Sequence, residues 1–190
     1  MANHPRPSLA DLISQAEAVA AEVNESFAEL TPHQLDWKPA PDRWSVAQCL
    51  DHLITANAGY FPIFDRILQG EKKKTFWESL PLLPSLWGKM LIRAVAPDSP
   101  RKAKAPAVFQ PSSSDLGGDV VDRFLEQQDR LLAAMRAMEG LDLESVILTS
   151  PAAGFITYSL RDALEIVVPH ERRHFQQALR VKALEGFPAA

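Results

Sequence analysis

Residues 159–181, SLRDALEIVVPHERRHFQQALRV, form the most informative stretch of the chain. Their apolar side chains recur every three to four positions, which predicts one long amphipathic helix with a buried stripe. Two histidines, one helical turn apart, lie on that stripe, so both imidazoles can point at a common ligand. The stripe comprises Leu160, Ala163, Val167, His170, His174, Ala178 and Val181.

Three more helical patterns precede this one. The first spans about Ser8 to Leu30, and the second runs from Ser45 toward Gly70 after the capping-box sequence SVAQ. We expect Pro62 to kink the second helix. The third pattern spans Ser114 to Glu139. Four such helices predict an all-α four-helix bundle in a single domain, residues 1–190.

The connections between these helices differ in length and character. Thr31 to Arg43 contains three prolines and predicts a loop. The long crossover from Glu71 to Ser113 contains an apolar stripe at helical spacing between Trp77 and Ala94. We expect a shorter helix there, packed over one end of the bundle or in a homodimer interface. Val146 to Tyr158 predicts a small hairpin or an extended loop.

Composition excludes several classes of protein. Apolar residues make up 46% and charged residues 23%, with a net charge of −4, so there is no overall basic field for nucleic acid. Two basic runs, Lys72–Lys74 and Arg101–Lys104, are typical of solvated loops. The single cysteine, Cys49, rules out an internal disulfide and a thiolate zinc cluster, and we place it in the core. Without a membrane span or secretory signal, we expect a soluble cytoplasmic protein with no membrane partner.

The histidines provide the strongest candidate site. His52 follows Cys49 by one turn on the inward face of the second helix, so it can join His170 and His174 at one metal ion. Alternatively, all three are ordinary polar residues at the margin of the core. His4, in the N-terminal tail, and His33, in the proline-containing loop, are predicted to be solvated surface residues.

The motif H-E-x-x-H at His170–His174 also occurs in zinc peptidases. The extended peptidase form would require Gly in place of Gln177 and His in place of Arg180. Few residues follow His174, and no upstream sheet is predicted that would align a peptide. The sequence therefore argues against a peptidase.

Two segments resemble the DinB-like superfamily. LDWKPAPDRWSVAQCLDHLITAN resembles the region of its second helix, where a W-S-x-x-x-x-x-x-H-L pattern supplies one metal-binding histidine. Residues 159–181 resemble its last helix, where H-x-x-x-H supplies two more. The resemblance implies a metal triad of His52, His170 and His174 with Gln177 as neighbour. It also implies an up-up-down-down four-helix bundle, frequently dimeric, with some members acting as thiol S-transferases.

Pro169, inside the last helix, departs from the pattern, and we expect it to bend the helix at the site.

Catalytic assignments beyond the metal are weaker. Glu171 is the tempting base, but it points about 100° away from His170, so we place it on the exposed side of the helix. The same objection applies to Asp51 beside His52. Gln177 lies one turn beyond His174 and can hydrogen-bond a ligand or substrate. Asn57 and Tyr60 are lesser pocket candidates.

Three functions are compatible with this site. The leading one is a metal-dependent enzyme acting on a small molecule, as a hydrolase or as a thiol S-transferase using a low-molecular-weight thiol. The alternatives are a non-catalytic protein that binds a small ligand through the metal, and a structural bundle. Zn²⁺ is the expected ion, with Ni²⁺ or Fe²⁺ also suited to imidazole ligands.

Overall fold

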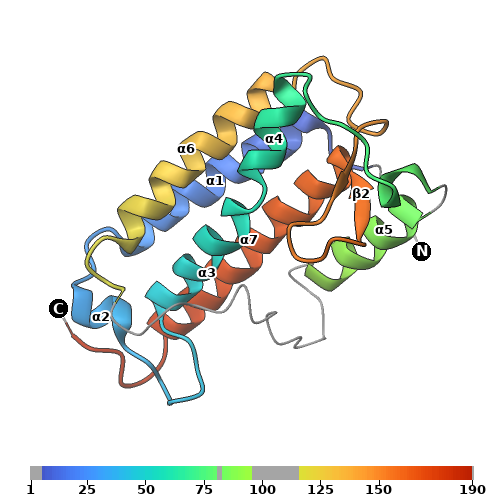
Figure 1. Cartoon of the computed structure of the whole chain (residues 1–190). Helices are drawn as coiled ribbons and strands as arrows, with labels where there is room; N and C mark the ends of the chain where they lie inside the picture. Colours follow the sequence, from blue (N-terminus) through green and yellow to red (C-terminus); the bar gives the residue numbers. More distant parts are fainter. Residues whose placement is uncertain (1–5, 81–82, 96–115, 190) are drawn as a thin grey trace.

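Four long helices form a bundle in the computed structural model, which describes residues 6–80, 83–95 and 116–189 (Figure 1). They are α1 (Leu9–Phe27), α3 (Val46–Ala58), α6 (Val120–Ala137) and α7 (Leu160–Lys182). Both α1 and α3 pack against α6 and α7, which places α1 and α3 at opposite corners. The predicted all-α four-helix bundle is confirmed.

The helices run up-down-down-up in chain order, in place of the up-up-down-down order that the resemblance implied. Arg6, just before α1, bonds Asp162 at the start of α7, and Lys182 at the end of α7 donates to the carbonyl of Ser26 near the end of α1. These two helices are therefore parallel, whereas α3 and α6 run in the opposite direction (Figure 1). The short link after α1 reverses the chain, and the long crossover after α3 carries it back before α6 begins.

Helix ends follow local sequence signals. Ser8, Ser45 and Ser159 each cap a helix through a complete capping box, so α1, α3 and α7 begin close to where the sequence predicts. The expected kinked helix from Ser45 to Gly70 is instead two helices, α3 and α4 (Phe61–Leu68). Pro62 lies in the first turn of α4, where its missing N–H costs nothing, so the chain starts a new helix there.

The last helix continues through Pro169 without interruption. The expected bend does not break α7, and the two histidines that follow the proline stay on one face of the helix. A proline removes only one intrahelical hydrogen bond, and the extensive packing of α7 on its neighbours offsets this loss.

The connections add smaller elements. Within the expected loop at 31–43, Pro32–Asp36 forms the short helix α2, on which His33 is exposed as predicted. The predicted hairpin is present, with β1 (Ile147–Thr149) antiparallel to β2 (Thr157–Ser159) and Leu148 opposite Tyr158. His4 and Arg101–Lys104 lie outside the described residues.

The crossover contributes η1 (Trp77–Ser79) and α5 (Leu83–Val95). Helix α5 packs against β2 and α7, which confirms that this segment covers part of the bundle. Its close approach requires Gly88, because a Cβ there would collide with the carboxylate of Asp162. Leu86 and Met90 remain exposed, so the homodimer interface expected here stays a prediction.

The core consists of two apolar clusters along the bundle. One contains Leu12, Phe64, Met135 and Leu164, and the other contains Val23, Leu50, Phe124 and Phe175. Cys49 is fully buried in the second cluster, as predicted. Across the described ranges, no helix combines the length and apolarity needed to cross a lipid bilayer.

Candidate metal centre

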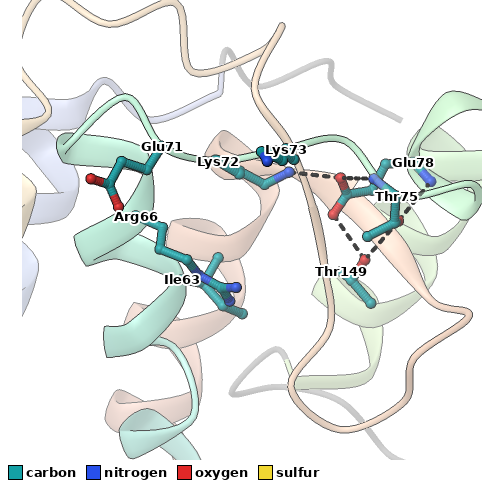
Figure 2. A pocket seen from close by; sticks show the side chains of 8 residues that line it. All are labelled: Ile63, Arg66, Glu71, Lys72, Lys73, Thr75, Glu78 and Thr149. Carbon is teal, nitrogen blue, oxygen red and sulfur yellow. Dashed lines mark hydrogen bonds and ion pairs between the residues drawn. The ribbon is translucent and has the colours of Figure 1, made fainter.

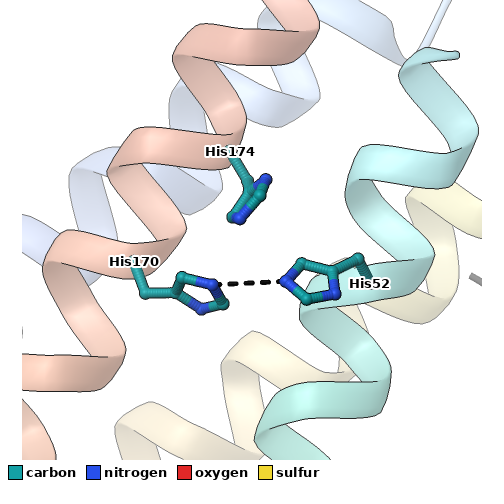
Figure 3. A group of neighbouring side chains, drawn as sticks. All are labelled: His52, His170 and His174. Atoms are coloured by element: carbon teal, nitrogen blue, oxygen red, sulfur yellow. Dashed lines mark hydrogen bonds between the residues drawn. The ribbon is translucent and has the colours of Figure 1, made fainter. Parts of the chain in front are cut away.

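Three histidines from two helices converge at one point (Figure 3). His52 projects from α3, and His170 and His174 project toward it from successive turns of α7. One imidazole nitrogen of each residue lies within 4.8 Å of the other two. The Nε2 atoms of His52 and His170 are 3.2 Å apart. The structure thus brings together the three histidines that the sequence singled out.

The donor set suits a divalent ion. Two nitrogens bound tetrahedrally to one ion with Zn–N bonds of about 2.05 Å would lie about 3.3 Å apart, close to the observed spacing of His52 and His170. In addition, Nδ1 of His174 is buried and finds no hydrogen-bond partner among the described residues. A buried polar atom without a partner is costly, and coordination of an ion by this ring would compensate.

The electrostatics favour the neutral imidazoles that metal binding requires. Burial, with smaller contributions from the nearby His52 and Arg173, lowers the pKa of His170 to about 3. Burial also lowers the pKa of His174 to about 2, and the nearby His170, His52 and Arg173 contribute to this decrease. Both rings are therefore uncharged at neutral pH.

Trp44 forms one wall of the centre, which sequence reasoning did not assign. Its ring stacks on His174 with centroids 5.6 Å apart and an interplanar angle of 25°. It also contacts the ring of His52 at a centroid distance of 5.0 Å. Trp44 is the tryptophan of the W-S-x-x-x-x-x-x-H-L pattern that contains His52, so this pattern was the signal available in the sequence.

We expected Glu171 on the exposed side of α7, but it is completely buried. One carboxylate oxygen accepts a hydrogen bond from Asn57 at 2.7 Å and the other accepts one from Gln128 at 3.1 Å. Burial raises its pKa to about 8, and these two hydrogen bonds oppose the increase. The overlooked signal is spacing: position 171 lies four residues after Val167 and four before Phe175, both buried.

The other polar candidates also have partners away from the centre. Asp51 is buried and pairs with Arg123 of α6 at 3.4 Å, which corrects its expected exposure. The hydroxyl of Tyr60 lies 2.7 Å from that of Tyr158 in the core. Gln177 lies one turn beyond His174 and acts to raise the pKa of that histidine, so it does adjoin the centre.

A separate surface cavity lies beside α4 and contains none of the three histidines (Figure 2). It is lined by Ile63, Arg66, Glu71, Lys72, Lys73, Thr75, Glu78 and Thr149. Glu78 accepts hydrogen bonds there from Lys72 at 2.7 Å and from Thr149 at 2.8 Å. The basic run at 72–74 thus pairs partly within the chain.

Comparison with known proteins agrees with this architecture. The chain is 27% identical over 158 residues to the uncharacterized protein YuaE of Bacillus subtilis, covering 80% of this chain and 86% of YuaE. Its fold is similar to that of YfiT from Bacillus subtilis, described as a probable metal-dependent hydrolase with an unusual four-helix bundle topology. That likeness has a TM-score of 0.57 at 18% identity and covers 94% of this chain and 91% of YfiT. Residues 15–178 match the DinB superfamily, and the chain belongs to that superfamily.

Proposed function

We propose that this protein binds one divalent metal ion through His52, His170 and His174 and uses it to hydrolyse a small molecule. The observation that carries the proposal is the convergence of three imidazole nitrogens from two helices, with His52 buried and both His170 and His174 half-buried. The structurally similar YfiT, described as a probable metal-dependent hydrolase, supports the same class of reaction.

A divalent ion in this position would supply Lewis acidity, activating water or a thiol at neutral pH. The ligands are three neutral imidazoles, and the ligand group found among the described residues includes no carboxylate, so the ion's charge is not compensated by the protein. Trp44 shields one side of the two rings that it contacts. Gln177, which adjoins His174, would orient a bound group. Glu171 is buried and bonded to Asn57 and Gln128, which argues against it as the general base.

A thiol S-transferase is the second candidate, and the same donor set favours it. A thiol that coordinates an ion is deprotonated directly, so this chemistry needs no carboxylate base at the site. The single cysteine cannot provide the sulfur, because Cys49 is fully buried and burial raises its pKa to about 12. The thiol would therefore be a low-molecular-weight cosubstrate.

The ion we expect is Zn²⁺, with Ni²⁺ and Fe²⁺ as alternatives for an imidazole site. We further propose a cytoplasmic homodimer that acts on a small-molecule substrate, and neither nucleic acid nor membrane as partner. The alternatives are a non-catalytic protein that holds a small ligand through the ion, and a structural bundle.

The test is a screen of metal-loaded protein against simple esters and amides, and separately against thiols mixed with electrophiles. Turnover should disappear on chelation and in His170→Ala, and it should be weakened less in Gln177→Ala. Activity that survives both chelation and His170→Ala would place the chemistry elsewhere. A metal-binding protein that is silent in both screens would favour the ligand-binding alternative.

A further inference from the structure

A polar layer crosses the otherwise apolar axis of the bundle at Glu171. Its carboxylate accepts hydrogen bonds from Asn57 of α3 and Gln128 of α6, at 2.7 and 3.1 Å. The amide of Gln128 also donates to the carbonyl of Ala16 on α1 at 3.4 Å. All four bundle helices therefore meet in one hydrogen-bonded group, and every side chain in it is buried.

Stability alone does not explain an acid at this place. Glu171 is fully buried, and Val167 and Phe175, one turn before and after it on α7, belong to the two apolar clusters. A buried carboxylate is expensive to desolvate, and apolar replacement of such groups is often neutral or stabilising. Buried polar groups do, in some proteins, select one packing arrangement over its alternatives.

The layer constrains the two helices that carry the histidines. The Glu171–Asn57 hydrogen bond joins α7 directly to α3, five residues after His52. Because successive helical residues are 100° apart, a carboxylate fixed at the bundle axis sets the direction of the neighbouring His170. An imidazole nitrogen roughly 6 to 7 Å from the helix axis moves by roughly 2 Å when the helix rotates by about 20°. Metal coordination tolerates about 0.2 Å.

We propose that Glu171 is a positioning residue of the histidine centre, which holds α7 at the rotation that aims His170 and His174 at His52. This inference rests on the proposed metal site. It differs from the role of the corresponding glutamate in H-E-x-x-H peptidases, because here the carboxylate binds amide groups of neighbouring helices and lies in the core.

The test replaces Glu171 with leucine, which keeps most of the volume and suits the apolar surroundings. Glu171→Leu should weaken Co²⁺ or Zn²⁺ binding about 10-fold or more, a loss typical of changes just outside the ligand shell. It should also alter the visible absorption of the Co²⁺-loaded protein. Glu171→Gln, which retains one acceptor oxygen, should restore much of the affinity and the spectrum.

Glu165→Leu is the matched control. Glu165 is also a buried acid on α7, but it pairs with Arg6 and Arg161 near the start of that helix. This variant should bind metal as the unmodified protein does. Should Glu171→Leu fail to fold, Asn57→Ala carries the same test, since it removes only the link to α3.

A second readout separates this inference from the proposed function. The readout is the NMR spectrum of metal-free protein labelled with ¹⁵N-histidine. The ring nitrogens of His52 and His170 lie 3.2 Å apart, so their chemical shifts depend on how the two helices are positioned. Glu171→Leu should change these shifts and Glu165→Leu should not. If the unmodified protein binds no metal, the proposed function fails, but these NMR signals still test whether Glu171 positions the histidines. Unchanged metal affinity and Co²⁺ spectrum in folded Glu171→Leu, or unchanged histidine signals in its metal-free form, would overturn the inference.

Discussion

Metal should stabilise the native state, and the loss of any one histidine should remove that effect. The three ligands come from α3 and α7 and converge only in the folded bundle, so an ion bound there favours the folded state. At a free concentration 100 times its Kd, the ion stabilises the protein by about 2.7 kcal/mol. For a chain of this size that corresponds to an increase in Tm of roughly 5 to 11 °C.

Removal of one ligand should nearly abolish this increase. If His174→Ala raises Kd about 100-fold, the same metal concentration equals the new Kd, and the stabilisation falls to about 0.4 kcal/mol. The remaining change in Tm is then roughly 1 to 2 °C. His33→Ala is the control, since His33 is exposed on α2 and should leave the full increase.

The assay is differential scanning calorimetry of chelator-treated protein with and without added Zn²⁺, for the unmodified chain and for both variants. Each variant is compared with its own metal-free form, so any intrinsic effect of the substitution cancels. An increase in Tm that persists in His174→Ala, or one that is lost in His33→Ala, would refute the assignment of the ion to this centre.

Three further outcomes test the packing around the centre. Cys49 should react with an alkylating reagent at pH 8 only after denaturant unfolds the chain, because it is fully buried and its pKa is raised to about 12; fast labelling of native protein would contradict this. Gly88→Val should lower the free energy of unfolding by about 1 to 3 kcal/mol in urea titrations, since its side chain meets Asp162; an unchanged midpoint would show that α5 does not pack there. Tyr60→Phe should cost about 1 kcal/mol by removing the buried hydrogen bond to Tyr158, and a neutral result would argue against that bond.

Periodicity and local signals in the sequence predicted the four long helices and indicated the histidine cluster. The spacing of His170 and His174 on an apolar stripe, with His52 on another, suggested the cluster because residues one turn apart share a helix face in any fold, and the resemblance to the DinB-like superfamily implied the same three residues. The capping box at Ser45 located a helix start for a similar reason, because it depends on side chains only three residues apart.

Only the tertiary structure determined which neighbours meet. The 100° separation from His170 correctly directed Glu171 away from the ligands, yet whether that direction faced water or core depended on the placement of α3 and α6. The direction of each helix also depended on the path of the long crossover, which no local pattern encodes. Trp44 contacts His174 because α3 and α7 are antiparallel, which brings the start of α3 next to the C-terminal half of α7. Sequence fixes the angle of a side chain on its own helix, whereas long-range packing fixes what lies opposite.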